Sequence, residues 1–179
     1  MNYSYSGPLT QQKLEQLLRD ILKNIPGSRW LGCEIRVPNS RRRWDMAFEL
    51  GSQTFIVEYD GDEHYRNSLK IKTDKAKDAL AKSLGYKVIR VPYWIQMDSE
   101  MATHYFSINA EIKEDYRHGF IDTKIFPGSF CEKGIKRFED ELNQIPSNVK
   151  TQVVKSIKDR VGEHGIEYVL PRSLYYFSE

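Results

Sequence analysis

The chain has 179 residues, a formal net charge of +2 and 40% hydrophobic residues. That length suits one ordinary domain, or a core of roughly 100 residues with an appended piece, and the small net charge means that any nucleic-acid binding must come from local clusters. The sequence has no apolar run near the ~20 residues of a membrane span and no signal-peptide stretch. Its two cysteines, Cys33 and Cys131, are too far apart to form a C-x-x-C motif. We therefore expect an intracellular, soluble protein (cytoplasmic, or nuclear if eukaryotic or viral) without a structural zinc site.

The hydrophobic pattern from about residue 10 to residue 96 predicts an α/β core. A first helix should begin after Thr10, a good N-cap residue, and end at Pro26. A second helix should be closed by Gly85. In chain order we expect a helix from 11, strands at 30–37, 44–50 and 54–59, a helix at 68–84 and a strand at 86–91. The predicted order is α-β-β-β-α-β, a mixed sheet flanked by helices, with its third strand central and paired with the second as a hairpin.

The pattern changes beyond residue 96 and predicts a mainly helical accessory region. We divide the chain into a core at 1–96 and an accessory region at 97–179 that packs on the core, because no linker is rich enough in Gly or Ser to tether a free domain. Within this region the sequence predicts helices at 98–112, 133–144 and 147–161, and a short strand at 167–170.

Three acidic residues cluster where two predicted strands end. Residues i and i+2 of a strand point to the same face, so Glu58 and Asp60 should emerge side by side, and the hairpin can bring Asp45 next to them. Three adjacent carboxylates repel one another unless a cation neutralises them. Hard oxygen ligands favour Mg²⁺ or Mn²⁺. The alternative is that these are ordinary strand residues facing solvent.

Two further residues near this cluster each allow two interpretations. His64 follows the Asp60-Gly61 turn and is either a surface residue or a catalytic one. Lys77 shares the apolar stripe of its predicted helix, whereas Asp78 should face away. An inward lysine either extends its ammonium group to the surface or reaches a buried anion.

The segments 44–45 and 57–64 resemble a branch of the PD-(D/E)XK nuclease superfamily, the one related to the very-short-patch-repair endonucleases. Proteins of this branch have an aspartate in one strand, followed by a Glu-x-Asp-Gly-x-x-His signature. Three residues fit the spacing of the helix that follows in that branch, and one matches the arginine that often ends its closing strand: Asp74, Lys77, Gly85 and Arg90. The resemblance covers roughly residues 10–96.

This resemblance implies a restriction-endonuclease-like core and metal-dependent phosphodiester hydrolysis of DNA. Asp45, Glu58 and the Tyr59 carbonyl would hold Mg²⁺ or Mn²⁺. Asp60, His64 or Lys77 would position or deprotonate the attacking water. The chain departs from the wider superfamily at position 60, where a lysine normally stands, so all three candidates stay open. Glu15 fits a further acid often found in the first helix of the family.

A run of arginines lies in the loop directly before Asp45. The guanidinium groups of Arg41, Arg42 and Arg43 would suit a phosphate backbone, although a solvated hairpin loop has the same composition. We expect DNA as the partner and no membrane, and leave a homodimer open. Restriction, homing, repair and mobile-element enzymes share this core. The alternatives are a catalytically inactive nuclease-fold module that binds nucleic acid, and an RNA-directed nuclease.

Overall fold

The computed structural model describes residues 3–5, 7–114 and 116–179, and the chain divides into two compact units. The sheet unit comprises Thr10–Asp60 and Lys72–Pro92. The helical unit takes in the described residues among 1–9, with Gly61–Ile71 and Tyr93–Glu179. The chain therefore leaves the sheet unit after Asp60 and returns to it at Lys72. The predicted boundary after residue 96, and the packing of 97–179 on the core, stay predictions.

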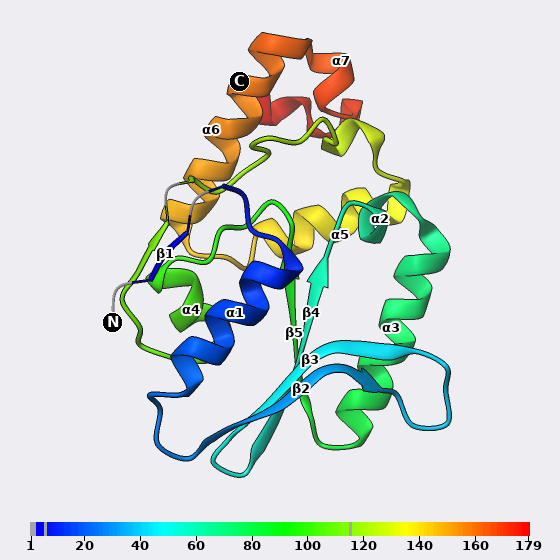
Figure 1. Cartoon of the computed structure of the whole chain (residues 1–179). Coiled ribbons are helices and arrows are strands. Elements are labelled where there is room, and N and C mark those ends of the chain that lie inside the picture. Colours follow the sequence, from blue (N-terminus) through cyan, green and yellow to red (C-terminus); the bar gives the residue numbers. More distant parts are fainter. Residues whose placement is uncertain (1–2, 6, 115) are drawn as a thin grey trace. The chain divides into compact units, whose positions relative to one another are not determined.

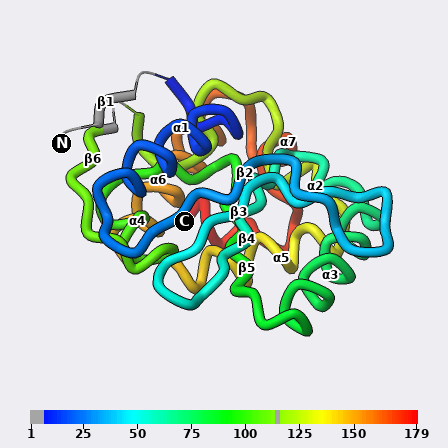
Figure 2. The backbone as a smooth tube through the Cα atoms, turned by 60° about the horizontal axis from the view of Figure 1, so that its bottom comes forward, coloured from blue at the N-terminus to red at the C-terminus, as the bar shows by residue number. Residues whose placement is uncertain are grey.

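The sheet unit is an α/β arrangement built around a four-stranded mixed sheet in the order β2-β3-β4-β5 (Figure 1). The first three strands pair in antiparallel fashion, and β4 and β5 are parallel. The tube in Figure 2 shows the same order of strands from another direction. The strands are β2 (Ser28–Arg36), β3 (Arg43–Leu50), β4 (Gln53–Asp60) and β5 (Lys87–Pro92). The predicted hairpin and the central place of the third strand are confirmed.

Two helices lie on opposite sides of this sheet, α1 (Gln11–Leu22) and the part of α3 (Ser68–Ser83) from Lys72 onward (Figures 1 and 2). The predicted cap is present, because the Thr10 hydroxyl accepts a hydrogen bond from the Lys13 N–H at 3.2 Å. The residue that stops α3 is Gly85, whose φ of +79° is unfavourable for other residues. The apolar stripe of α1 is buried and consists of Leu14, Leu17, Leu18, Ile21 and Leu22.

Alternation along the strands decides which side chains face α3. Ala47 and Ile56 are register partners and form one buried cluster with Ala81 of α3. Phe48 and Phe55 point to the opposite face, where their rings stack at 4.8 Å. The even-numbered residues of β4 therefore belong to the α3 face, and they include Glu58 and Asp60. Trp44 of β3 also belongs to this cluster, so the alternation seen at Ala47 and Phe48 does not continue unbroken to Asp45.

The helical unit holds a small parallel sheet, several helices and an aromatic core. Rings of Trp94, Phe120 and Phe138 pack against one another with centroid separations of 5.1 to 6.4 Å. Its strands are β1 (Tyr3–Tyr5) and β6 (Ile112–Glu114). Its helical elements are α2 (Glu63–Arg66), α4 (Ser99–Phe106), η1 (Pro127–Ser129), α5 (Glu132–Leu142), α6 (Ser147–His164), α7 (Ile166–Val169) and η2 (Arg172–Ser178).

Two predictions for this unit need correction. The helix predicted at 98–112 stops at Phe106, because Ser107 adopts a left-handed φ of 56°. The strand predicted at 167–170 is instead the short helix α7, which follows Gly165 with its φ of 87°. Among the described residues, no helix combines the length and the apolar character needed to cross a bilayer.

Candidate metal centre

Asp45 and Glu58 lie close together on neighbouring strands of the sheet. The register pairs Met46 with Val57, and Asp45 and Glu58 are the next residues along the two strands. The Asp45 carboxylate also accepts a hydrogen bond from the Tyr59 N–H at 2.8 Å. Glu58 is buried, with 1% of its surface exposed. The structure therefore brings together the two acids that the sequence assigned to a metal.

Lys77 reaches this pair from α3. Its ammonium nitrogen lies 2.6 Å from Glu58 Oε1, a close ion pair. Only 8% of Lys77 is exposed. Of the two interpretations open for this inward lysine, contact with a buried anion is confirmed. A cation delivered from the helix thus lies beside an acid of the sheet.

The electrostatic environment of Glu58 disfavours its ionised form. Burial, and then the negative charge on Asp45, raise the pKa of Glu58 to about 7, although Lys77 and Arg90 act to lower it. A carboxyl group that titrates near neutral pH in a site of this kind is a common mark of functional chemistry. Added positive charge beside Glu58 would favour its ionised form.

Arg90, the residue opposite Glu58 on β5, holds a second group of acids. Its guanidinium lies 2.7 Å from the Asp60 carboxylate and binds both carboxylate oxygens of Asp78 at 2.8 to 3.1 Å. Asp74 lies further from it, at 3.7 Å. Burial alone would lower the pKa of Arg90, but these carboxylates raise it above its ordinary value. The prediction that Asp78 faces away was wrong, since it is half-buried and paired.

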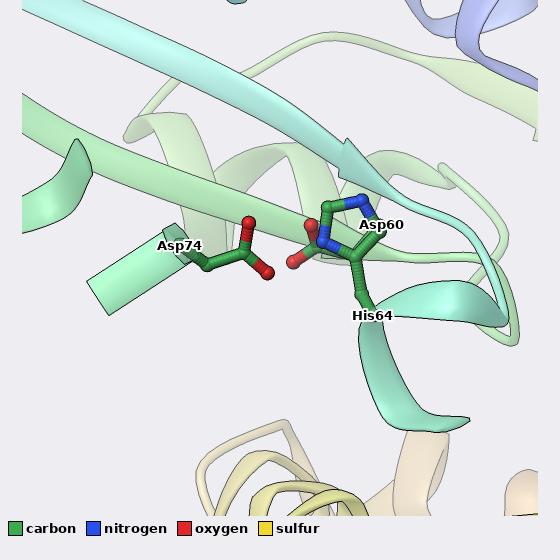
Figure 3. A group of neighbouring side chains, drawn as sticks. All are labelled: Asp60, His64 and Asp74. Carbon is green, nitrogen blue, oxygen red and sulfur yellow. The ribbon is translucent and has the colours of Figure 1, made fainter. Parts of the chain in front are cut away.

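Asp60 and Asp74 lie close together and are both buried. One carboxylate oxygen of each is within 4.8 Å of the other, an arrangement that could also hold a cation (Figure 3). Figure 3 also labels His64, which follows Asp60 by four residues and lies on α2 of the helical unit. There, the His64 N–H donates to the Gly61 carbonyl at 3.1 Å, and Arg137 donates to the His64 carbonyl at 3.3 Å.

The other predicted residues lie elsewhere in the sheet unit. Arg41 and Arg42 are exposed in the loop between β2 and β3, and Arg43 is the first residue of β3. Glu15 lies on α1, across the sheet from α3, where it forms a 3.2 Å ion pair with Arg19. Burial and the adjacent Glu15 raise the pKa of the Cys33 thiol to about 12. The structure therefore does not bring Glu15 to Asp45 and Glu58.

No protein-family model matches this chain, and neither the curated proteins nor the solved structures include a significant match to it. The chemistry of the site therefore rests on its own residues. Asp45 and Glu58 offer hard oxygen donors, and the raised pKa of Glu58 reflects its burial and the neighbouring negative charge of Asp45. A divalent ion such as Mg²⁺ or Mn²⁺ fits both observations.

Proposed function

We propose that this protein is a metal-dependent endonuclease of the PD-(D/E)XK kind that hydrolyses phosphodiester bonds of DNA. One observation carries the proposal, namely the convergence of Asp45, Glu58 and Lys77 from two strands and one helix, with Lys77 2.6 Å from Glu58. Two acids and a lysine brought together at a mixed sheet supply both a metal-binding pair and a cation for a phosphate substrate.

Each residue of this group has a distinct role in the proposal. Asp45 and Glu58 would hold Mg²⁺ or Mn²⁺, and the Asp45 carboxylate is oriented by the Tyr59 N–H. When bound, a divalent ion neutralises charge on the phosphoryl group and makes water more acidic. The oxygen of a water molecule would form a bond to phosphorus as that water gives up a proton, one ester P–O bond would break, and the departing alkoxide would take up a proton.

Among the three candidates for orienting the attacking water, the contacts favour Lys77. Asp60 is engaged by Arg90 at 2.7 Å, so one of its carboxylate oxygens is already occupied by a guanidinium. Lys77 touches Glu58 directly. We therefore assign Lys77 the task of orienting the water and stabilising developing negative charge. His64 belongs to the same Glu-x-Asp-Gly-x-x-His pattern as Glu58 and Asp60, and on that ground it stays a candidate for proton transfer.

Plasmid cleavage tests the proposal. Supercoiled DNA incubated with the protein and Mg²⁺ or Mn²⁺ should be nicked or linearised, and Asp45→Ala and Glu58→Ala should each reduce cutting to the level seen with EDTA. Glu49→Ala is the matched control. Glu49 lies on β3, as Asp45 does, but it pairs with Arg29, whose side chain is exposed. Calorimetry should show metal binding by the wild type and by the control, and a loss of binding in the two site variants.

Two results would overturn the proposal. Lack of cutting together with lack of metal binding that depends on Asp45 and Glu58 would favour a module that binds nucleic acid without cutting it. Faster cleavage of a matched RNA than of DNA would reassign the substrate.

Lys77→Met tests the role of the lysine. Cleavage should fall by about a hundredfold or more, as expected for loss of a group that assists proton transfer or orients water, while calorimetry still detects metal binding. Lys75→Met is the control, because Lys75 is exposed on the same helix. Full cleavage by Lys77→Met would return the role to Asp60 or His64.

A further inference from the structure

The hairpin that joins β2 to β3 carries an unusual concentration of positive charge. Arg36, Arg41, Arg42 and Arg43 fall within eight residues and are all exposed, and we call them the arginine hairpin. Arg36 and Arg43 are register partners across the strand pair. Like charges directly opposite one another destabilise a strand pair. The arrangement therefore weakens the hairpin unless an anion lies against it.

Little of this charge is neutralised within the protein. Arg43 donates to the Glu34 carbonyl at 2.9 Å, and its Nε lies 3.9 Å from the Glu34 carboxylate, with both side chains more than half exposed. Arg36, Arg41 and Arg42 have no carboxylate within 4.0 Å among the residues that the structure describes. Three guanidinium groups are thus available to an external anion.

The backbone of the hairpin is held by its own hydrogen bonds. The Val37 N–H donates to the Arg42 carbonyl at 3.0 Å, and the Ser40 N–H donates to the Val37 carbonyl at 3.2 Å. The Ser40 hydroxyl in turn accepts from the Arg42 N–H at 3.1 Å. Val37 is buried, and residues 36–41 line a shallow depression. A fixed backbone lowers the entropic cost of placing several arginines against one ligand.

The composition of the hairpin indicates the kind of anion. Guanidinium groups match phosphate oxygens with paired hydrogen bonds. Residues 36–43 include no aromatic side chain, whereas proteins that bind single strands usually stack bases on aromatic rings. This difference favours the backbone of a duplex. Arg43 also precedes Asp45 by two residues on β3, so the hairpin leads directly into the strand that carries Asp45.

We propose that the arginine hairpin binds the phosphate backbone of duplex DNA, without reading its sequence and without requiring the metal. The choice of DNA rests on the proposed function. The binding itself does not, because it depends on charge rather than on Asp45 and Glu58. Arg36 lies outside the run Arg41-Arg42-Arg43 in the sequence. It joins the arginine hairpin because the strand register places it opposite Arg43.

Fluorescence anisotropy with a labelled DNA duplex of arbitrary sequence, in EDTA, tests this proposal. A triple variant, Arg36→Gln/Arg41→Gln/Arg42→Gln, should bind at least about tenfold more weakly, and its slope of log affinity against log salt should be shallower by about one for each phosphate group that the variant no longer neutralises. Replacing the same three arginines with lysine should keep most of the slope, which separates charge from a role in folding. Thermal melting checks that each variant is folded.

The matched control removes three arginines that already have acidic partners. Arg19, Arg29 and Arg117 pair with Glu15, Glu49 and Asp159, so their replacement by glutamine changes the net charge equally but should leave the salt slope nearly unaltered. Equal losses in both triple variants would overturn the proposal, as would tighter, arginine-dependent binding to a matched RNA duplex. If the wild type cuts plasmid DNA with metal but the triple variant of the arginine hairpin binds the duplex as tightly as the wild type, only the role of the arginine hairpin is refuted. If duplex binding depends on these arginines but the wild type does not cut, only the proposed nuclease activity is refuted.

Discussion

The two helices beside the sheet differ in what they bury. Helix α1 presents a stripe of leucine and isoleucine to the interior, and its charged residues lie among exposed or half-buried positions. Helix α3 buries Asp74 and Lys77 in the same kind of position. Buried charges disfavour folding unless they are paired. The α1 side therefore stabilises the fold through apolar packing. On the α3 side, burying charged side chains costs free energy of folding, and a functional site would explain why they are there.

The contrast extends to the sheet itself. On the face opposite α3 lie stacked rings such as Phe48 and Phe55. On the α3 face lie Glu58 and Asp60, paired with Lys77 and Arg90 respectively. Changes on the α3 side should therefore alter charge, pH response and activity together, and changes on the α1 side should alter stability alone.

The largest effect on stability is expected for Arg90→Ala. Removing this guanidinium takes away the cation that contacts the buried carboxylates of Asp60 and Asp74, which should lower the free energy of unfolding by about 3–5 kcal/mol. Urea denaturation measures the loss. Arg29→Ala removes a surface ion pair whose arginine side chain is 68% exposed, and should cost no more than about 1 kcal/mol. Similar losses in the two variants would contradict the role of Arg90.

A somewhat smaller effect is expected from the ionisation of Glu58. Its pKa in the folded protein, about 7, is above its ordinary value of 4.5, so the folded state holds the proton more tightly than the unfolded state. The resulting stabilisation is present below pH 4.5 and is lost as the pH rises through 7. Relative to Glu58→Gln, the wild type should lose up to about 3 kcal/mol over this range in EDTA.

Urea unfolding of both proteins at a series of pH values measures that loss. Added Mg²⁺ should reduce it in the wild type, because a bound cation favours the ionised carboxyl. A constant difference between the two proteins from pH 4.5 to 7 would show that Glu58 does not titrate there.

The smallest effect is expected at the α1 cap. Thr10→Ala removes the hydroxyl that accepts from the Lys13 N–H and should cost about 1 kcal/mol of stability. Plasmid cutting by the folded protein should be unchanged, because α1 lies across the sheet from Lys77. Thr10→Ser serves as the conservative control. If Thr10→Ala cut less plasmid than the wild type at the same folded fraction, the expectation that α1 affects stability alone would be wrong.

Local patterns predicted much of the sheet unit. The β-branched residues of 54–59 predicted a central strand, and Gly85 predicted the end of α3; both are confirmed. The place of Lys77 on an apolar stripe showed that it turns inward, but the identity of its partner depended on how α3 lies over β4. Periodicity within one element carries no information on that placement.

The failures have the same origin. Asp78 was predicted to face away, but it pairs with Arg90 of a separate strand, and the pattern of its own helix does not reveal that partner. Arg36 comes opposite Arg43 because the β2–β3 register shifts between Trp30 and Gly32, an irregularity that alternation does not reveal. The short segment 167–170 is apolar enough for either helix or strand, and such runs are ambiguous by pattern alone.

The path of the chain between the two units bears on its synthesis. Every residue of the sheet unit has been translated once Pro92 is added, yet the excursion at 61–71 belongs to the helical unit. Within that unit the buried Tyr65 ring stacks on Phe130, and its carbonyl lies where any side chain on Gly134 would collide with it. Those partners are added roughly 40 residues after Pro92, a delay of a few seconds on the ribosome. A nascent chain would thus contain all residues of the sheet unit before α5, the helix that packs against segment 61–71, has been synthesised.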